Sequence, residues 1–462
     1  MSAPPANREN RFDWPVCQEA EDFLLAQIEL FLTRNAFARQ LADRMTSDTG
    51  TLLLDWVDYI VLSQNHGPVL TTLGFVPDTT AETPPEHAAW HHPEAMLPRI
   101  ILEEGHDRYP NALAIHVESL PHFMAVHAVS REIEGPPLSR FRRALISDEH
   151  GTCFYAVERR GYRGFLPDPH HADATTASLL QAMELWQIRQ RCFASAEDGY
   201  QLTFALLDEI IAMVGRDLAC HLVFAGERDY WQRRNRAAQV QKNRQDRLGL
   251  GWANHDHHTF RSSRSQFVNL MRVMEKLGFE RRERYYAGDQ AGWGAQILEQ
   301  PVEGIVSFCD VDLRPEDTEI DFSRQPLPPQ PSLGTIGLWT GLHGESFLES
   351  GMHHLECRFD HALLRDQLAG VGINTMKPFS DLPFLKQAFT EGERWQVRPE
   401  RVQALLDHGS IDAGQASRFL SDGAIGSHLE NLQRKGGFKG FNQKSVSAII
   451  AAVDPRKMVS TA

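Results

Sequence analysis

The chain has little of several features that mark specialised classes of protein. Its six cysteines are scattered and form no C-x-x-C pair, so the sequence predicts neither a disulfide framework nor a zinc–thiolate site. No apolar run reaches the roughly 18 residues that a membrane-spanning helix needs. The N-terminal stretch MSAPPANRENRFDWP also has no apolar segment of the kind found in signal peptides. We therefore expect a cytoplasmic protein that is not inserted in a membrane.

The chain also has fewer basic than acidic residues. The 47 lysines and arginines are outnumbered by 61 aspartates and glutamates, which gives a net charge of −14. This balance argues against general binding to nucleic acids or to anionic membranes. A basic stretch at 231–247 has no aromatic residue between its arginines and is interpreted as a solvated helix. With 42% hydrophobic and 23% charged residues, the composition is that of a globular protein.

A chain of 462 residues is too long for one ordinary core and predicts two or more domains. Apolar residues at helical spacing predict helices within 17–46, and short segments rich in branched residues between 51 and 165 predict an antiparallel sheet. Further helices are expected at 175–195 and 200–216. We divide the chain into an N-terminal α+β domain expected to hold no metal (1–230), a connecting helix (231–250), and a catalytic metal-binding domain (251–462) with a proline-rich linker at 323–333.

The second half repeats one pattern on either side of that linker. Each unit begins with a strand and a helix and continues with further extended segments, so two βαβββ-like units in tandem are predicted. The fold class is therefore α+β, with an open curved sheet around a central site. The predicted elements are strand 254–261, helix 264–277, strands near 281–286, 293–299 and 304–313, then strand 352–359, helix 360–369, and a helical insertion at 398–420.

Two of the predicted strands are rich in histidine: NHDHHTFR at 254–261 and GMHHLECR at 351–358. Because alternate residues of a strand point to the same face, His354 shares a face with Glu356 and Arg358. On the earlier strand, His257 shares a face with Thr259 and Arg261. His257 is the preferred ligand there, with His255 and His258 as alternatives.

The stretch 428–446 adds a carboxylate, Glu430, to these two strands. The candidate metal ligands are therefore His257, His354 and Glu430. Histidine-rich strands also occur as ordinary structure, and most glutamates are solvated. Two imidazoles and one carboxylate on one side of a metal nevertheless leave open positions for substrate and oxygen, as in non-haem Fe(II) oxygenases.

The run ENLQRKG at 430–436, followed by Gly440-Phe441, resembles the C-terminal motif of 4-hydroxyphenylpyruvate dioxygenases, in which a metal-binding Glu precedes Gln-Arg and then Gly-Phe. The segments GMHHL at 351–355 and Asp256-His257 resemble the two histidine strands of the same family. The resemblance implies that Fe(II) is bound by His257, His354 and Glu430, and that Phe441 lines the substrate pocket. This family belongs to the vicinal-oxygen-chelate superfamily, which is built from βαβββ modules.

The spacing His-x-x-x-Arg, from His257 to Arg261 and from His354 to Arg358, is similar to that of 2-oxoadipate dioxygenase/decarboxylases of the same superfamily. In that family an arginine next to the first ligand holds a substrate carboxylate. The similarity implies that Arg261, and with it Arg358, binds a carboxylate. The glycine-containing segment 287–296 lacks the strand-to-helix context of a phosphate loop. It is interpreted as a hairpin whose Gln296 faces the cavity.

These observations predict a non-haem Fe(II) dioxygenase that takes O2 and a 2-oxo acid as its small-molecule partners, releases CO2 and hydroxylates the remaining acid. Three alternatives stay open: a redox-neutral isomerase or lyase, a ring-cleaving dioxygenase of the same superfamily, and a metal-free binding protein. Neither the identity of the 2-oxo acid nor its aromatic or aliphatic character follows from the sequence. Members of the superfamily are often dimers or tetramers, so the resemblance implies a homo-oligomer.

Overall fold

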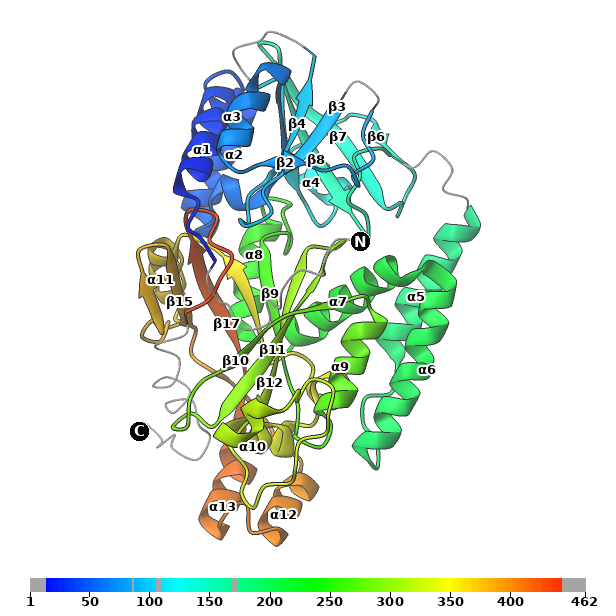
Figure 1. Ribbon diagram of the computed structural model, residues 1–462, viewed down its shortest axis with the longest axis vertical. Helices are drawn as coiled ribbons and strands as arrows, with labels where there is room; N and C mark the ends of the chain where they lie inside the picture. The colour runs from blue at the N-terminus through cyan, green and yellow to red at the C-terminus, as the bar shows by residue number, and fades with distance from the viewer. Residues whose placement is uncertain (1–13, 85–86, 105–109, 168–172, 443–462) are drawn as a thin grey trace.

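The computed structural model describes residues 14–84, 87–104, 110–167 and 173–442. Two curved sheets lie one above the other in Figure 1, the N-terminal sheet at the top and the C-terminal sheet below it. Three helices cover one side of the C-terminal sheet: α5 (Asp173–Ile188), α6 (Ala196–Val214) and α7 (Arg216–Gln232). The helices predicted at 175–195 and 200–216 are thereby confirmed.

The C-terminal sheet has the strand order β10-β11-β12-β9-β13-β17-β15-β14. It consists of two βαβββ units whose first strands, β9 and β13, pair antiparallel at the centre. The predicted α+β fold with tandem βαβββ units is confirmed. The first unit is β9 (His255–Arg261), α9 (Phe267–Lys276), β10 (Glu280–Tyr286), β11 (Trp293–Gln300) and β12 (Ile305–Asp312); the second is β13 (His354–Arg358), α11 (His361–Ala369), β14 (Ser380–Leu382), β15 (Leu385–Phe389) and β17 (Ala424–Arg434).

The second unit carries an insertion before its last strand. It contains the short strand β16 (Glu393–Trp395), which pairs with β17, and the helices α12 (Pro399–Asp407) and α13 (Ala413–Asp422). The insertion confirms the helical segment predicted at 398–420. A further helix, α10 (Thr335–His343), follows the segment 323–333, which contains neither helix nor strand.

The N-terminal sheet repeats the same connectivity, in the order β2-β3-β4-β1-β5-β8-β7-β6. The prediction of an antiparallel sheet is confirmed for most strand pairs and wrong for two, because β1 pairs parallel with β4 and β5 pairs parallel with β8. In each unit the helix leads the chain to an outer strand. The next two strands then bring the chain back, so that the last strand lies beside the first and parallel to it. The elements are β1 (Val57–Ser63), α3 (Gly67–Thr72), β2 (Val76–Pro77), β3 (His87–His91) and β4 (Arg99–Glu103), then β5 (Ala112–His116), α4 (Leu120–Val126), β6 (Ile133–Glu134), β7 (Phe141–Glu149) and β8 (Thr152–Arg159).

Two helices begin at an asparagine N-cap. Asn35 caps α2 (Ala36–Arg44), which follows α1 (Gln18–Leu32), and Asn235 caps α8 (Arg236–Asp246). In both cases the side-chain oxygen accepts a hydrogen bond from the third residue after the cap, which satisfies a free N–H group of the first turn. The helices predicted within 17–46 are confirmed, and α8 lies within the predicted connecting segment. The domain limits themselves remain a prediction. No helix in the described part of the chain has the length and apolar character to cross a membrane.

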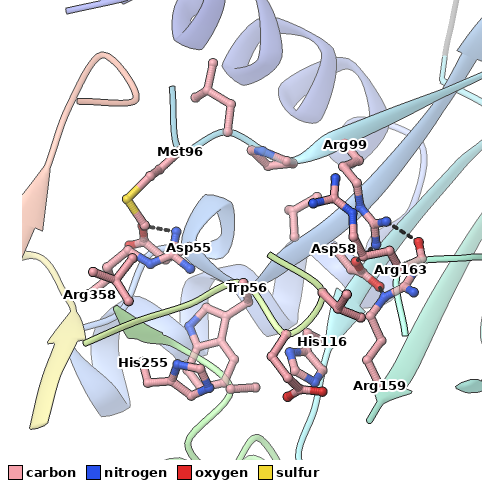
Figure 2. A pocket seen from close by; sticks show the side chains of 18 of the residues that line it. Asp55, Trp56, Asp58, Met96, Arg99, His116, Arg159, Arg163, His255 and Arg358 are labelled. Carbon is pink, nitrogen blue, oxygen red and sulfur yellow. Dashed lines mark hydrogen bonds and ion pairs between the residues drawn. The ribbon is translucent and has the colours of Figure 1, made fainter. Parts of the chain in front are cut away.

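A cavity of about 560 Å³ lies between the two halves (Figure 2). Its wall combines residues of the N-terminal sheet, such as Asp58 and Arg159, with residues of α7 and the C-terminal sheet, such as Arg228 and Arg358. It is distinct from the site described in the next subsection.

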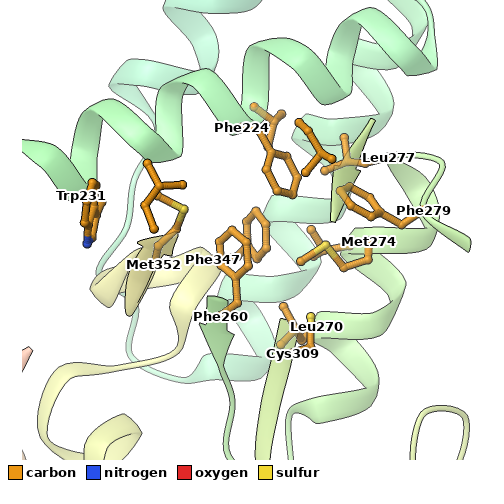
Figure 3. Close-up of a cluster of buried hydrophobic side chains, with 14 of the residues drawn as sticks. Phe224, Trp231, Phe260, Leu270, Met274, Leu277, Phe279, Cys309, Phe347 and Met352 are labelled. Carbon is orange, nitrogen blue, oxygen red and sulfur yellow. The ribbon is translucent and has the colours of Figure 1, made fainter. Parts of the chain in front are cut away.

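One face of the C-terminal sheet packs on helices α5, α6, α7 and α9 (Figure 3). Phe260 of β9 stacks on Phe347 with ring centroids 4.5 Å apart, and Phe224 of α7 covers both. Strand alternation then turns the intervening residues to the opposite face. That opposite face holds the histidines and glutamates of the predicted site.

Candidate metal centre

Three adjacent strands place one row of polar side chains across the middle of the C-terminal sheet. Glu356 on β13 lies opposite His257 on β9 and beside Glu430 on β17. One ligand atom from each of these three residues lies within 4.8 Å of the others, and all three side chains are buried. The row is therefore a consequence of strand register.

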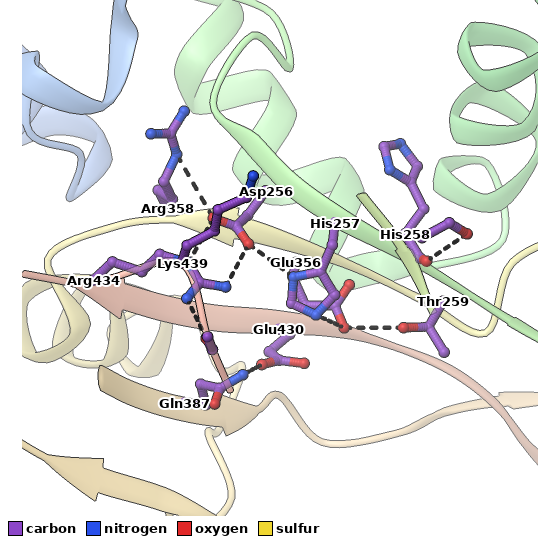
Figure 4. Close-up of polar contacts among 12 residues, drawn as sticks. Asp256, His257, His258, Thr259, Glu356, Arg358, Gln387, Glu430, Arg434 and Lys439 are labelled. Atoms are coloured by element: carbon purple, nitrogen blue, oxygen red, sulfur yellow. Dashed lines mark hydrogen bonds and ion pairs between the residues drawn. The ribbon is translucent and has the colours of Figure 1, made fainter. Parts of the chain in front are cut away.

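His354 lies two residues before Glu356 on β13 and reaches the same carboxylate; Figure 4 shows His257, Glu356 and Glu430. His354 Nε2 lies 2.5 Å from Glu356 Oε1 and 3.7 Å from Glu430 Oε2, while His257 Nε2 lies 2.8 Å from the same Glu356 oxygen. The predicted ligands His257, His354 and Glu430 thus converge, and Glu356 lies between them. We describe the donor set as these four residues, because Glu356 contacts both imidazoles.

The two alternative histidines of β9 lie on the other side of the sheet. A bulge shifts the pairing so that Glu356 faces His257 and Cys357 faces His255, with Asp256 between them. His255 and His258 face one another with ring centroids 5.2 Å apart, and His258 packs on Phe224. Of the three histidines, His257 alone lies beside the two glutamates.

Asp256, the bulged residue, orients His257. Its Oδ1 accepts a hydrogen bond from His257 Nδ1 at 2.9 Å, which leaves Nε2 directed at the glutamates. Arg434 contacts both carboxylate oxygens of Asp256 at 2.9 Å and also donates to the carbonyl groups of Phe438 and Gly440. Burial alone would raise the pKa of Asp256, but the charge of Arg434 and the hydrogen bond from His257 hold it well below its usual range. A carboxylate behind a histidine is a common support for metal ligands.

The protonation states of the four donors suit a cation. Burial lowers the pKa of His257 to about 4 and that of His354 well below its usual value, so both imidazoles are neutral. Burial raises the pKa of Glu430 to about 8, and burial together with the charge of Glu430 raises the pKa of Glu356. Two carboxylates held this close in a dry site repel one another when both are ionised, and a cation removes that cost.

Two further observations support a bound cation. Glu356 Oε2 is buried and has no hydrogen-bond partner among the described residues. Glu430 Oε1 accepts a hydrogen bond from Gln387 Nε2 at 2.9 Å, and Thr259 donates to Glu356 Oε1 at 3.1 Å. Both carboxylates are thus fixed in place by neutral donors, with lone pairs left over. The residues present fit a divalent metal with nitrogen and oxygen ligands.

The four donors face a small cavity of about 70 Å³. Phe441 lines it and contacts His257 and Phe308, at ring-centroid distances of 5.0 and 4.4 Å. Arg261 also lines it; its nearest carboxylate is that of Asp310, 3.8 Å from Nε. Burial raises the pKa of Asp310 to about 7 and lowers that of Arg261 to about 10. Aromatic side chains form most of the remaining wall: Tyr285, Trp293, Phe308, Phe379, Phe389.

Two residues predicted at the cavity do not line it. Arg358 shares a face with Glu356 but lies beyond it, where its guanidinium is 4.0 Å from Asp55 and 4.0 Å from Asp256 in the wall of the larger cavity. Gln296 donates to the backbone carbonyls of Glu283 and Ile297. Its neighbours on β11, Trp293, Ala295 and Ile297, pack in the cluster that contains Phe441, and alternation turns Gln296 to the other face.

Several residues of the site were not predicted. Glu356 lies two residues after His354 on one strand face, and this spacing could have identified it. Asp256 directly precedes His257, and Arg434 belongs to the Gln-Arg pair of the C-terminal motif, but neither position alone predicts their contact. Of the stretch 428–446, residues 443–446 lie outside the described part of the chain.

No protein-family model and no curated protein matches the sequence. Solved structures with a similar fold include a 4-hydroxymandelate synthase mutant from Streptomyces coelicolor (12% identity, TM-score 0.28), with 88% of this chain and 100% of that chain covered. A second, from Ralstonia eutropha JMP134, is described as a glyoxalase superfamily protein (15% identity, TM-score 0.32; 57% and 96% covered). A third is a fusion of a xylose isomerase-like TIM barrel with 4-hydroxyphenylpyruvate dioxygenase (11% identity, TM-score 0.23; 95% and 59% covered). At these identities and TM-scores the similarity carries no argument about the reaction or the site.

Proposed function

We propose that the protein is a non-haem Fe(II)-dependent dioxygenase that converts a 2-oxo acid and O2 into a hydroxylated acid and CO2. One oxygen atom of O2 enters the carboxylate that forms as CO2 leaves, and the other enters the new hydroxyl group. The observation that carries the proposal is that His257 and His354 both contact Glu356, with Glu430 beside them, in the wall of a largely aromatic cavity. Fe(II) bound there would activate O2 and polarise the keto group of the substrate.

Arg261 is the residue we assign to substrate binding. It is 5% exposed, and its Nε has no hydrogen-bond acceptor among the described residues. With a pKa raised to about 7, Asp310 is partly protonated near neutral pH and neutralises Arg261 incompletely. A substrate carboxylate can therefore take up the guanidinium in a two-point contact.

Other side chains keep the site dry and its ligands oriented. The aromatic wall, with Phe441 against His257, excludes water from the reacting atoms, which strengthens every electrostatic contact inside. Asp256 keeps His257 in the tautomer that presents Nε2, and Gln387 holds Glu430. These are positioning roles, exerted through the ligands.

The test is oxygen consumption by protein loaded anaerobically with Fe(II), measured against a panel of 2-oxo acids while CO2 release is followed in parallel. We expect uptake and CO2 release in equal amounts for at least one acid. Arg261→Gln should raise the KM for that acid more than it lowers kcat, because it removes a binding contact. Iron bound at full occupancy without oxygen uptake for any acid would contradict the proposal.

A second function is favoured by Glu356, the fourth donor. Four protein ligands leave fewer positions on a metal than a chelating 2-oxo acid and O2 together require. With a redox-inert metal such as Zn(II), the same site would act as a Lewis acid, and Glu356 would move a proton next to the substrate keto group, as in an isomerase or lyase.

The two functions differ in their need for oxygen. The Zn(II)-loaded protein can be incubated with the same acids in D2O without oxygen, and exchange of the protons next to the keto group followed by NMR. Exchange that is lost in Glu356→Gln would favour the redox-neutral enzyme. Absence of exchange, together with oxygen uptake by the Fe(II) protein, would favour the dioxygenase.

A further inference from the structure

The larger cavity, between the two halves, has an unusual set of unsatisfied polar atoms. Among the described residues, six residues of its wall have a buried nitrogen without a hydrogen-bond partner: Trp56, His91, Arg159, Arg163, His255 and Arg358. Indole and guanidinium nitrogens are donors only. No residue of this wall contributes a buried oxygen without a partner within the described part of the chain. The cavity therefore has an excess of donors.

The carboxylates of the wall pair with several of these side chains and with their neighbours, yet leave the six nitrogens without a partner among the described residues. Asp58 binds Arg99 and Arg159 at 3.0 and 2.6 Å. Glu158 binds Arg160 at 2.7 Å and also contacts Arg142. The remaining four each lie within 4.0 Å of a cationic side chain or a histidine: Asp55, Glu118, Glu299 and Glu303.

Two arginines in the wall are left without a close carboxylate. Arg228 is 8% exposed, and in the described structure its one side-chain hydrogen bond is with His258 Nε2, at 3.1 Å. Arg358 has carboxylates only at 4.0 Å, on Asp55 and Asp256. Buried guanidinium groups without an anion are costly, so the cavity favours an anionic occupant.

The cationic groups lie at two places in the wall. Figure 2 shows Arg358 beside Asp55 on one side of the cavity and Arg99, Arg159 and Arg163 on the other, with Trp56 and His255 between them. The volume of about 560 Å³ is that of a typical small-molecule site. A ligand with negative groups at both ends would reach both places.

We propose that this cavity is a second binding site, separate from the metal centre, for a small organic polyanion that carries carboxylate or phosphate groups at its ends. Arg358 and Arg228 bind one end. Arg163 and Arg159 bind the other through one nitrogen each, which their pairs with Asp78 and Asp58 leave without a partner among the described residues. Trp56, which is 1% exposed, donates its indole N–H between them. The proposal does not depend on the reaction at the metal centre, because none of these residues lines the smaller cavity.

The test uses the full-length protein freed of metal, so that chelation by the probe plays no part. Citrate and pyrophosphate serve as the carboxylate and phosphate probes and acetate as a single-charge control, each titrated by isothermal calorimetry. We expect one site per chain for citrate, pyrophosphate or both, no measurable heat with acetate, and weaker binding at higher salt. The stronger of the two probes identifies the ligand chemistry.

Substitutions locate the site. Arg358→Gln and Arg163→Gln should each weaken binding about tenfold, because each removes a charge-assisted contact, and Trp56→Phe should weaken it about threefold while keeping the ring. Arg163 has 36% of its side chain exposed, so its substitution is the variant most certain to fold. Melting temperatures of the variants check their folding.

Arg261→Gln and Glu430→Gln, in the metal centre, serve as matched controls and should leave probe binding unchanged. Loss of binding in Arg261→Gln with retention in Arg163→Gln would place the anion at the metal centre and overturn the proposal. Absence of binding by both probes would also overturn it and leave a cavity filled by water.

Discussion

The two sheets of this protein share one topology but differ in the chemistry of one face. In each sheet two βαβββ units meet at an antiparallel pair, β1–β5 in the N-terminal sheet and β9–β13 in the C-terminal sheet. The C-terminal face carries His257, Glu356 and Glu430 across three strands. The corresponding N-terminal strands carry buried apolar and aromatic residues: Tyr59, Val61, Ala112, Ala114, Val157.

The two sheets therefore show that one fold can carry different chemistry. A few residues on one face of the sheet decide whether it can bind a metal. The N-terminal face buries apolar side chains, and this burial stabilises the sheet. The C-terminal face instead buries four ionisable groups and so has less stabilisation from buried apolar surface. Such an arrangement favours a bound cation.

The largest expected effect comes from removing a donor on the C-terminal face. Glu430→Ala should abolish retention of iron and turnover, because it removes one of the two carboxylates of the donor set. Metal content after anaerobic reconstitution and desalting gives the measurement. Tyr59→Phe, on the matching face of the N-terminal sheet, is the control and should keep the iron content of the wild type. Full iron retention in Glu430→Ala would remove it from the ligand set.

The reverse pattern is expected for the N-terminal face. Phe141 is fully buried in its apolar cluster, and the Arg159 guanidinium lies over its ring, 4.5 Å from the centroid. Phe141→Ala should lower the free energy of unfolding by about 3–5 kcal/mol through the cavity that it leaves. Urea unfolding measures this cost, and iron bound per folded chain should stay at the wild-type level. A variant that unfolds as the wild type does, or that loses iron while folded, would break the distinction between the two faces.

A smaller effect is expected from the support behind His257. Asp256→Asn keeps the shape of the side chain but removes the charge that Arg434 and His257 contact. We expect metal affinity to fall about 10- to 100-fold, as is usual when such a support is changed. Competition with a chromophoric chelator measures it. Arg434→Lys should show a loss of the same kind, and unchanged affinity in both would show that His257 needs no support.

The smallest effect concerns pH in the metal-free protein. A pKa raised to about 8 means that protonated Glu430 stabilises the fold fully below its ordinary pKa of 4.5, and that this contribution is lost as pH rises through about 8. Glu430→Gln cannot ionise. It should therefore melt at a higher temperature than the wild type at about pH 9, and at a similar temperature near pH 5. Equal melting temperatures at both pH values would contradict the raised pKa.

The C-terminal fold could be predicted from the sequence because the strands and helices of its units have clear local patterns. Strand β9 has seven residues and β11 has eight, and the helix α9 lies between them in the sequence. The N-terminal units were not recognised, since β2 and β6 have only two residues each and leave no pattern to detect. The parallel pairing of β1 with β4 joins segments distant in the sequence, so local alternation cannot predict it.

For the site, alternation selected His257 and His354, and the C-terminal stretch added Glu430. Alternation could not predict the bulge at Asp256, which separates His257 from His255. Arg358 was assigned to the cavity wrongly because alternation does not say how far along a curved strand the cavity extends. Gln296 was assigned to it wrongly because the side chain lies on the other face of β11. Glu356 was not predicted as a ligand, although alternation places it on the same face of the strand as His354.

The most direct test of the metal centre is anomalous diffraction at the iron absorption edge, from crystals of the protein loaded anaerobically with Fe(II). We expect a single strong peak within bonding distance of His257, His354 and Glu430, and the distance to Glu356 would then decide whether three or four residues bind the metal. A peak elsewhere in the molecule, or none at this position in crystals that contain iron, would show that these residues do not form the metal site.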